Sequence, residues 1–205
     1  MFKVQGAAHL SAPDSDQPAY RSPGLQLIFK RINNGDKVNI LDFGSPLANN
    51  VEFFSAYHCR LTIADWLQSL PLGEDCWAES PAFSPLFPEL LSFDTKEQFD
   101  VILGWDIINY LDEDDIRRFS RFIAPYTKPD ALCFFSVITQ KNMAMQPAKY
   151  RIMAEDSLHC EQYDCDECPS PRFTQSRLLE LMKEFQAHRS FLLQNGRQEQ
   201  ILRIR

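Results

Sequence analysis

Short apolar runs that stop at acidic residues mark the sequence more clearly than any other feature. KVNILDFG passes Asp42 and reaches Gly44, RLTIAD ends at Asp65, and FDVILGWD ends at Asp106. Runs of this kind are typical of buried parallel strands that enter a turn at their carboxyl ends. Segments with helical spacing lie between them. The pattern therefore predicts an α/β fold in which helices cover both faces of a mostly parallel sheet.

The second half of the chain extends this pattern. A helix is expected over DEDDIRRFSRFIAPY, followed by a fourth buried strand, ALCFFSVIT. Thr174 is placed to cap a later helix with Leu178, Leu181–Met182 and Phe185 on one face. Two strands around Asn195–Gly196 then form a hairpin. This hairpin predicts one antiparallel strand near an edge of the sheet.

Length and periodicity predict one folded domain with an irregular arm. The chain has 205 residues, which is enough for a single core. Residues 1–24 contain three prolines and no periodic pattern, so we expect an irregular arm there, followed by a domain over 25–205. Within this domain, residues 140–173 form a long insertion with weak periodicity, and 71–92 are rich in proline and aromatic residues.

Charge and hydropathy exclude several classes of partner. The net charge is −7, which disfavours proteins that bind nucleic-acid phosphates or anionic lipid. No apolar run approaches the roughly 20 residues of a membrane span, and the N-terminus lacks the apolar core of a signal peptide. These features predict a cytoplasmic protein with mostly reduced cysteines and neither a nucleic-acid nor a membrane partner.

The segment LDFGSPLANN, together with the order of elements, resembles the class I S-adenosylmethionine (SAM)-dependent methyltransferases. In that family an acidic residue and a glycine-rich turn follow the first strand, and Asp42 and Gly44 match them. Pro46 and Ala48 stand where glycine is usual, and proline fixes φ and removes an N–H. The resemblance implies a Rossmann-like methyltransferase fold with an antiparallel C-terminal strand, and SAM as cofactor.

Further positions match the family's cofactor site. The resemblance implies that Asp65 accepts hydrogen bonds from the ribose hydroxyls, and it lies about twenty residues beyond the glycine turn, as in dinucleotide-type sites. Trp66 and Asp94 are then expected near the adenine. FDVILGWDIINYL resembles the family's fourth strand, which places Gly104 where open α/β sheets bind ligands.

Two residues after this strand are candidates for the chemistry. Asp106 and Tyr110 are expected either to act as a base or to orient the methyl acceptor. Alternatively, Asp106 caps the following turn and Tyr110 packs. The resemblance also implies that the insertion at 140–173 is a lid over the substrate, whereas the simpler interpretation is that its Met and Tyr residues pack over the sheet edge.

The insertion also holds a cysteine-rich segment that suggests a zinc site. His159, Cys160, Cys165 and Cys168 form the pattern HC-x4-C-x2-C. Structural zinc sites typically combine two close pairs of ligands, and a second C-x2-C pair is lacking here. Adjacent His159 and Cys160 are also poorly placed to share one metal. We therefore expect loop thiols without a metal.

Two functions follow from these observations. The first is a SAM-dependent methyltransferase that acts on a small molecule or a protein. The alternative is a domain that has kept the fold, lost catalysis and become a protein-binding or regulatory module. Pro46 and the sparse glycines of the loop motivate this alternative. Whether the chain is an enzyme therefore depends on whether the loop accepts SAM.

Overall fold

A computed structural model describes residues 18–65, 97–163 and 165–205. The described helices are α1 (Pro23–Ile32), α2 (Ala48–Ser55), α4 (Glu113–Ile123) and α5 (Gln175–Leu181), with 3-10 turns η2 (Ile107–Tyr110) and η3 (Ala124–Tyr126). The described strands are β1 (Tyr20–Arg21), β2 (Val38–Asp42), β3 (Cys59–Ile63), β4 (Phe99–Trp105), β5 (Thr127–Ile138), β6 (Asn142–Ala144), β7 (Lys149–Ala154), β8 (Ser157–Glu161), β9 (Glu167–Pro169), β10 (Phe185–Leu192) and β11 (Arg197–Ile204). Within these ranges, no helix has the length and apolar character needed to cross a membrane.

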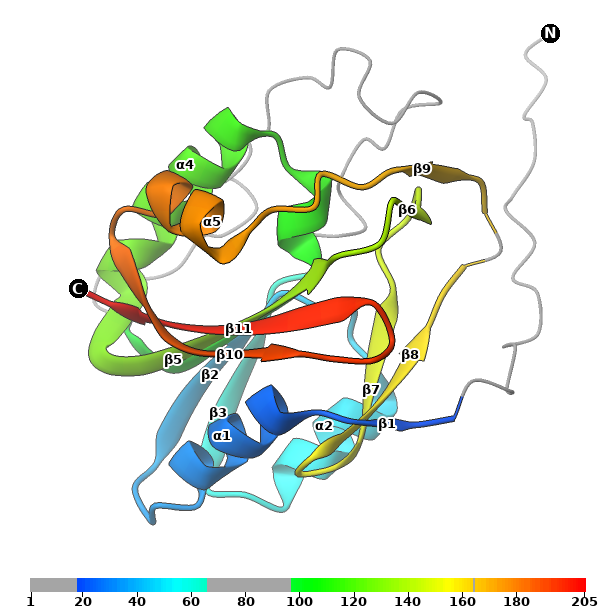
Figure 1. Cartoon of the computed structure of the whole chain (residues 1–205). Helices are drawn as coiled ribbons and strands as arrows, with labels where there is room; N and C mark the ends of the chain where they lie inside the picture. The colour runs from blue at the N-terminus through cyan, green and yellow to red at the C-terminus, as the bar shows by residue number, and fades with distance from the viewer. Residues whose placement is uncertain (1–17, 66–96, 164) are drawn as a thin grey trace, which may run out of the picture.

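The central sheet has six strands in the order β10-β11-β5-β4-β2-β3 (Figure 1). Strands β3, β2, β4 and β5 pair in parallel, while β11 is antiparallel to both β5 and β10. The mostly parallel sheet with a reversed last strand is thus confirmed. The reversed strand lies next to the edge of the sheet, as expected. The chain turns back after β10, so that β11 runs between β10 and β5.

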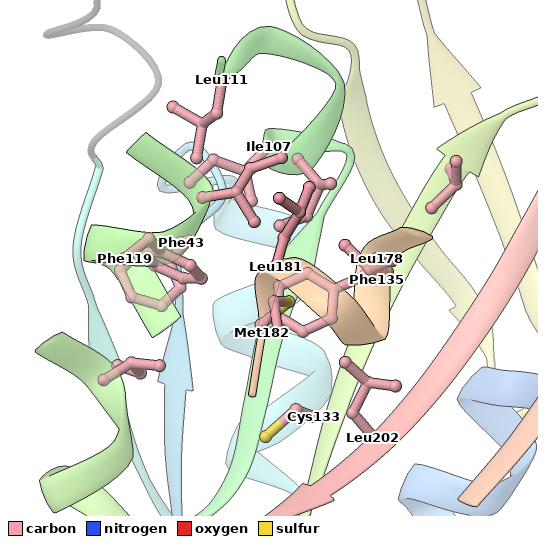
Figure 2. Close-up of a cluster of buried hydrophobic side chains, with 14 of the residues drawn as sticks. Phe43, Ile107, Leu111, Phe119, Cys133, Phe135, Leu178, Leu181, Met182 and Leu202 are labelled. Carbon is pink, nitrogen blue, oxygen red and sulfur yellow. The ribbon is translucent and has the colours of Figure 1, made fainter. Parts of the chain in front are cut away.

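Helices cover both faces of this sheet, as expected. In Figure 1, α4 and α5 lie on one face, and α1 and α2 lie on the other. Each face of the sheet forms its own hydrophobic core with the helices that cover it. Successive residues of β4 pack into different cores: Ile102 into the core with α4 and α5, and Val101 into the core with α1 and α2. Figure 2 shows the first of these cores, where Phe119 of α4 and Leu178 of α5 surround sheet residues such as Phe135.

Helix α1 begins inside the segment expected to be irregular. The Ser22 hydroxyl accepts a hydrogen bond from the Leu25 N–H at 3.1 Å and donates one to Glu199 at 2.5 Å. Glu199 also accepts the Gly24 N–H at 2.7 Å. The irregular arm therefore does not extend to residue 24, because this distant carboxylate fixes the helix start and because β1 pairs with β8. Residues 1–17 lie outside the described part.

The described part of the insertion at 140–173 contains four strands. β7 and β8 form a hairpin that β1 extends, and β6 pairs with β9. The inner side of this hairpin, with Tyr150, Ile152 and Leu158, joins the core beneath α1 and α2. After the insertion, Thr174 caps α5 as expected, but the helix ends at Leu181, so Phe185 starts β10 and is not part of the helical face.

Candidate functional site

The acidic residues singled out in the sequence gather at the carboxyl ends of three neighbouring strands. Asp42 ends β2, where it is paired with Ile63 of β3 and Leu103 of β4. Asp65 follows β3 and is half-buried, and Asp106 follows β4 and is fully buried. Since β2, β3 and β4 are parallel neighbours, these residues occupy the edge where open α/β sheets bind ligands.

The Asp42 carboxylate organises the turn after β2. Its Oδ1 accepts the Gly44 N–H at 2.8 Å and the indole Nε1–H of Trp105 at 2.5 Å. Burial raises the pKa of Asp42 to about 6, these two hydrogen bonds act in the opposite direction, and the charge of Asp65 raises it further. Asp42 therefore holds the loop and the end of β4 together.

The Trp105 side chain occupies the space beside Gly44. A Cβ added at Gly44 would lie 2.7 Å from the Trp105 Nε1, so the loop backbone and the indole are in direct contact. The indole is 1% exposed and stacks on Tyr150 of the insertion, with ring centres 5.1 Å apart and planes at 12°. By contrast, Pro46 is exposed. The ring that lies against Gly44 is thus a tryptophan from β4.

Gly104 is required by packing within the sheet. A Cβ at this position would lie 2.1 Å from the Cε1 atom of Phe135 on β5. The aromatic ring therefore covers the backbone of Gly104 on one side. Its expected role beside a cofactor stays a prediction, and the contact with Phe135 explains the glycine without one.

Asp106 lies in a buried polar cluster beneath the insertion. Its Oδ2 accepts the Ala148 N–H at 3.2 Å and lies 3.7 Å from Nη1 of Arg197. The same Arg197 atom donates to the Tyr150 hydroxyl at 2.5 Å, and that hydroxyl bonds in turn to Asp106. Burial raises the pKa of Asp106, and Arg197 opposes this. Asp106 is the N-cap residue of η2, where its carbonyl oxygen accepts the Asn109 N–H at 3.0 Å, whereas its side chain makes no capping bond.

Tyr110 faces the insertion and is 8% exposed. Its hydroxyl donates to the carbonyl oxygens of Ala144 at 3.1 Å and Gln146 at 2.9 Å. Desolvation by burial raises the pKa of this phenol, so it stays protonated and serves as a donor. Asp106 and Tyr110 therefore both bind backbone groups of the insertion in this structure. A role for either in catalysis requires that these contacts open.

Three residues of the site were not identified as site residues from the sequence. Trp105 lies within the motif FDVILGWDIINYL, and Tyr150 is one of the insertion's residues expected to pack over the sheet edge. Asn50 binds the same strand of the insertion through both ends of its amide, because it donates to the Tyr150 carbonyl at 2.8 Å and accepts the Ile152 N–H at 2.9 Å. The signal for Asn50 is a polar residue at the start of the helix that follows the loop LDFGSPLANN.

Trp66 and Asp94, the two residues expected near the adenine, lie outside the described residues. The cysteine-rich segment is divided between two sheets. His159 and Cys160 are on β8, whereas Cys168 is on β9 in a different sheet. In the described ranges, no three His, Cys, Asp or Glu side chains come together as metal ligands would.

Comparison with known proteins identifies the architecture. No protein-family model matches the sequence, and no curated protein matches it either. Among solved structures, 1,6-didemethyltoxoflavin-N1-methyltransferase from Burkholderia thailandensis matches 89% of this chain and 76% of its own, with a TM-score of 0.50 and 17% identity. A SAM-dependent methyltransferase from Clostridium acetobutylicum matches 88% of this chain and 90% of its own, with a TM-score of 0.51 and 12% identity.

The chain has the class I methyltransferase fold. The match covers most of both chains, and the reversed β11 next to β5 is the feature that the resemblance in the sequence implied. At this level of identity the similarity defines the fold. The activity of this methyltransferase fold has to be argued from its own residues.

Proposed function

We propose that this protein is a methyltransferase that binds SAM at the carboxyl ends of β2 and β3 and methylates a small-molecule acceptor. The observation that carries the proposal is the arrangement of Asp42, Gly44 and Asp65. They occupy neighbouring strand ends within a class I methyltransferase fold. The Burkholderia enzyme, whose structure contains S-adenosylhomocysteine and 1,6-didemethyltoxoflavin, supports a small molecule as acceptor over a protein.

The residues fit the two ends of SAM differently. Asp65 is half-buried at the end of β3, and a carboxylate there suits the vicinal hydroxyls of a ribose. The methionine end would lie beside Asp42 and Gly44, where the Trp105 indole now lies, so this side chain has to turn away. When bound, SAM supplies an electrophilic methyl group. The protein then has to position the acceptor and exclude water.

Calorimetric titration with SAM and with S-adenosylhomocysteine tests this function. We expect saturable binding that Asp65→Ala weakens more than tenfold, because the ribose hydroxyls lose their acceptor. Asp36→Ala, in the exposed turn before β2, is the matched control and should bind as the wild type does. If Asp65→Ala binds as tightly as the wild type, Asp65 is not part of the site.

A second function is favoured by the Trp105 contacts. The indole bonds to Asp42 and packs on Gly44, and this arrangement also suits a binding or regulatory module that has given up the cofactor. Absence of heat and of a thermal shift at millimolar SAM, in both the wild type and Trp105→Gly, would favour this module. For both functions we propose a cytoplasmic protein without a nucleic-acid or membrane partner, in keeping with the net charge of −7.

A further inference from the structure

Two aromatic rings from different parts of the chain close the space beside the glycine turn. Trp105 comes from the end of β4, and Tyr150 comes from β7 of the insertion. Their rings are nearly parallel, and both side chains are almost fully buried. Phe134 also packs edge-on against the indole, with ring centres 5.6 Å apart. We call Trp105 and Tyr150 together the ring pair.

The backbone at Trp105 is in an unusual conformation. Its φ is +47°, in the left-handed region, which bulky L-residues rarely adopt. Such conformations persist only where surrounding contacts impose them, and they are concentrated at active sites, ligand clamps and switch regions. Here the imposing contacts are the bond to Asp42 and the stack on Tyr150.

Residues outside the insertion hold Tyr150 in place from several directions. Asn50 of α2 binds the backbone on either side of it, at the Tyr150 carbonyl and the Ile152 N–H. Arg197 of β11 donates to its hydroxyl, and the Arg197 guanidinium also lies over the ring, 5.4 Å from its centre. The position of the Trp105 ring is thus coupled to the position of the insertion.

We infer that the ring pair is an autoinhibitory gate, in which the insertion, through Tyr150, holds Trp105 against Gly44 and excludes the cofactor until the insertion lifts. This inference rests on the proposed function, because it concerns access to the same site. Movement of β7 removes the stack, and Trp105 can then leave the left-handed conformation and vacate the space beside Gly44. The apparent affinity for the cofactor is then the affinity of the open state multiplied by the fraction of molecules that are open.

The first test follows the indole without any ligand. Trp66 and Trp77 are replaced by Phe, so that Trp105 is the remaining tryptophan of the three. In this background Tyr150→Leu should raise acrylamide quenching of Trp105 several-fold, whereas Tyr150→Phe, which keeps the ring, should change it little. Tyr57→Ala, which removes an aromatic ring packed on Phe29, is the control. Equal quenching in Tyr150→Leu and Tyr150→Phe would overturn the gate.

The second test measures access to the cofactor site by calorimetry with S-adenosylhomocysteine. Tyr150→Leu and Trp105→Gly should each bind at least tenfold more tightly than the wild type. Glycine also tolerates the positive φ at position 105, which makes Trp105→Gly a useful second variant if Tyr150→Leu folds poorly. If the wild type already binds as tightly as both variants, the gate is wrong and the proposed function stands. If none of the three binds, the proposed function itself is wrong.

Discussion

At the scale of single residues, buried carboxylates connect the candidate site to the rest of the protein. Asp42, Asp106 and Glu199 are each at most 1% exposed, and burial raises the pKa of all three. Asp42 accepts hydrogen bonds from an indole and a loop amide, and Glu199 accepts from a helix N-terminus. Asp106 accepts the Ala148 N–H and lies 3.7 Å from the Arg197 guanidinium. Ionising such groups without full compensation costs free energy, so their charge state affects stability.

Asp42 should make the stability of the protein decrease as the pH rises. Its pKa is raised from 3.8 to about 6 in the folded state, so the unfolded chain loses this proton first. The contribution is fully present below pH 3.8 and is lost as the pH rises through about 6. The side chain of Asp42→Asn cannot ionise. As the pH rises from 3.8 to about 6, its free energy of unfolding should therefore increase relative to that of the wild type by on the order of 3 kcal/mol.

Urea denaturation at several pH values, for the wild type and Asp42→Asn in parallel, measures this difference. Asp106 and Glu199 also have raised pKa values, and they contribute equally to both proteins. The difference between the two proteins therefore reports the ionisation of Asp42 and its charge interaction with Asp65. Parallel curves for the two proteins would contradict a raised pKa at Asp42.

Gly104→Ala should destabilise the fold, because the new Cβ meets the Phe135 ring at 2.1 Å. Overpacking of this kind costs about 1–3 kcal/mol. Replacing Phe135 by Leu in the same chain should restore part of the loss, which thermal denaturation of both variants will show. A Gly104→Ala protein of normal stability but with weaker SAM binding would instead assign the glycine to the cofactor.

The sequence alone indicated Asp42, Gly44 and Asp65 as neighbours, because each follows a short apolar run and parallel strands end at one edge. It did not indicate what fills the space between them. The position of the Trp105 ring depends on a left-handed backbone and on Tyr150, which comes from a segment with weak periodicity. Contacts between distant segments leave no local pattern in the sequence.

At the scale of elements, α1 shows how a distant residue determines where a helix begins. Proline in the first turn and a serine cap are local signals. The Glu199 carboxylate, which accepts from the Ser22 hydroxyl and the Gly24 N–H, belongs to β11. The helix and the last strand of the described sheet therefore stabilise each other, and the first helix can dock fully only when β11 is in place.

Glu199→Ala should lower the free energy of unfolding by about 3 kcal/mol, because it leaves two buried donors without an acceptor. Ser22→Ala removes the cap and one of these donors, and should cost about 1 kcal/mol. The double variant should lose less than the sum of the two single losses, since both act on one network. Chemical denaturation of the three proteins provides the comparison, and strict additivity would mean that Ser22 and Glu199 act independently.

Most elements of the central sheet were predictable, because their apolar runs are continuous and end in turn residues. The strands of the insertion were not. In β7, the buried residues Tyr150 and Ile152 alternate with more exposed ones, and Leu158 of β8 is buried beside them. Both strands are short, and they pair with each other and with β1. A two-stranded hairpin of this length has little stability alone, so its strand character depends on packing against α2 and the core.

At the scale of the whole molecule, the described structure combines a six-stranded sheet with an insertion that packs on the core and is held by side-chain hydrogen bonds. Asn50, Tyr110 and Asp106 each bind backbone groups of the insertion. The described strands of the insertion share no backbone ladder with the central sheet. We therefore expect the insertion to open locally with a lower free energy than global unfolding.

Asn50→Ala should speed hydrogen exchange in β7 and leave the central sheet unchanged. The Ile152 N–H loses its acceptor and the Tyr150 carbonyl loses its donor. We expect protection at Ile152 to fall at least tenfold, which corresponds to about 1.4 kcal/mol. Asn49→Ala, at the exposed neighbouring position, is the control. Uniform loss of protection through β2, β4 and β5 would show that the insertion and the sheet unfold as one unit.

The position of β11 has a consequence for how the protein is made. β5 pairs with β11 along its outer edge, yet the ribosome synthesises the whole insertion, α5 and β10 before β11. Throughout that interval β5 carries an unpaired edge, and such edges recruit other chains. A nascent chain that stalls before Arg197 would thus expose a long apolar strand, and chaperones that shield strand edges would matter most in that window.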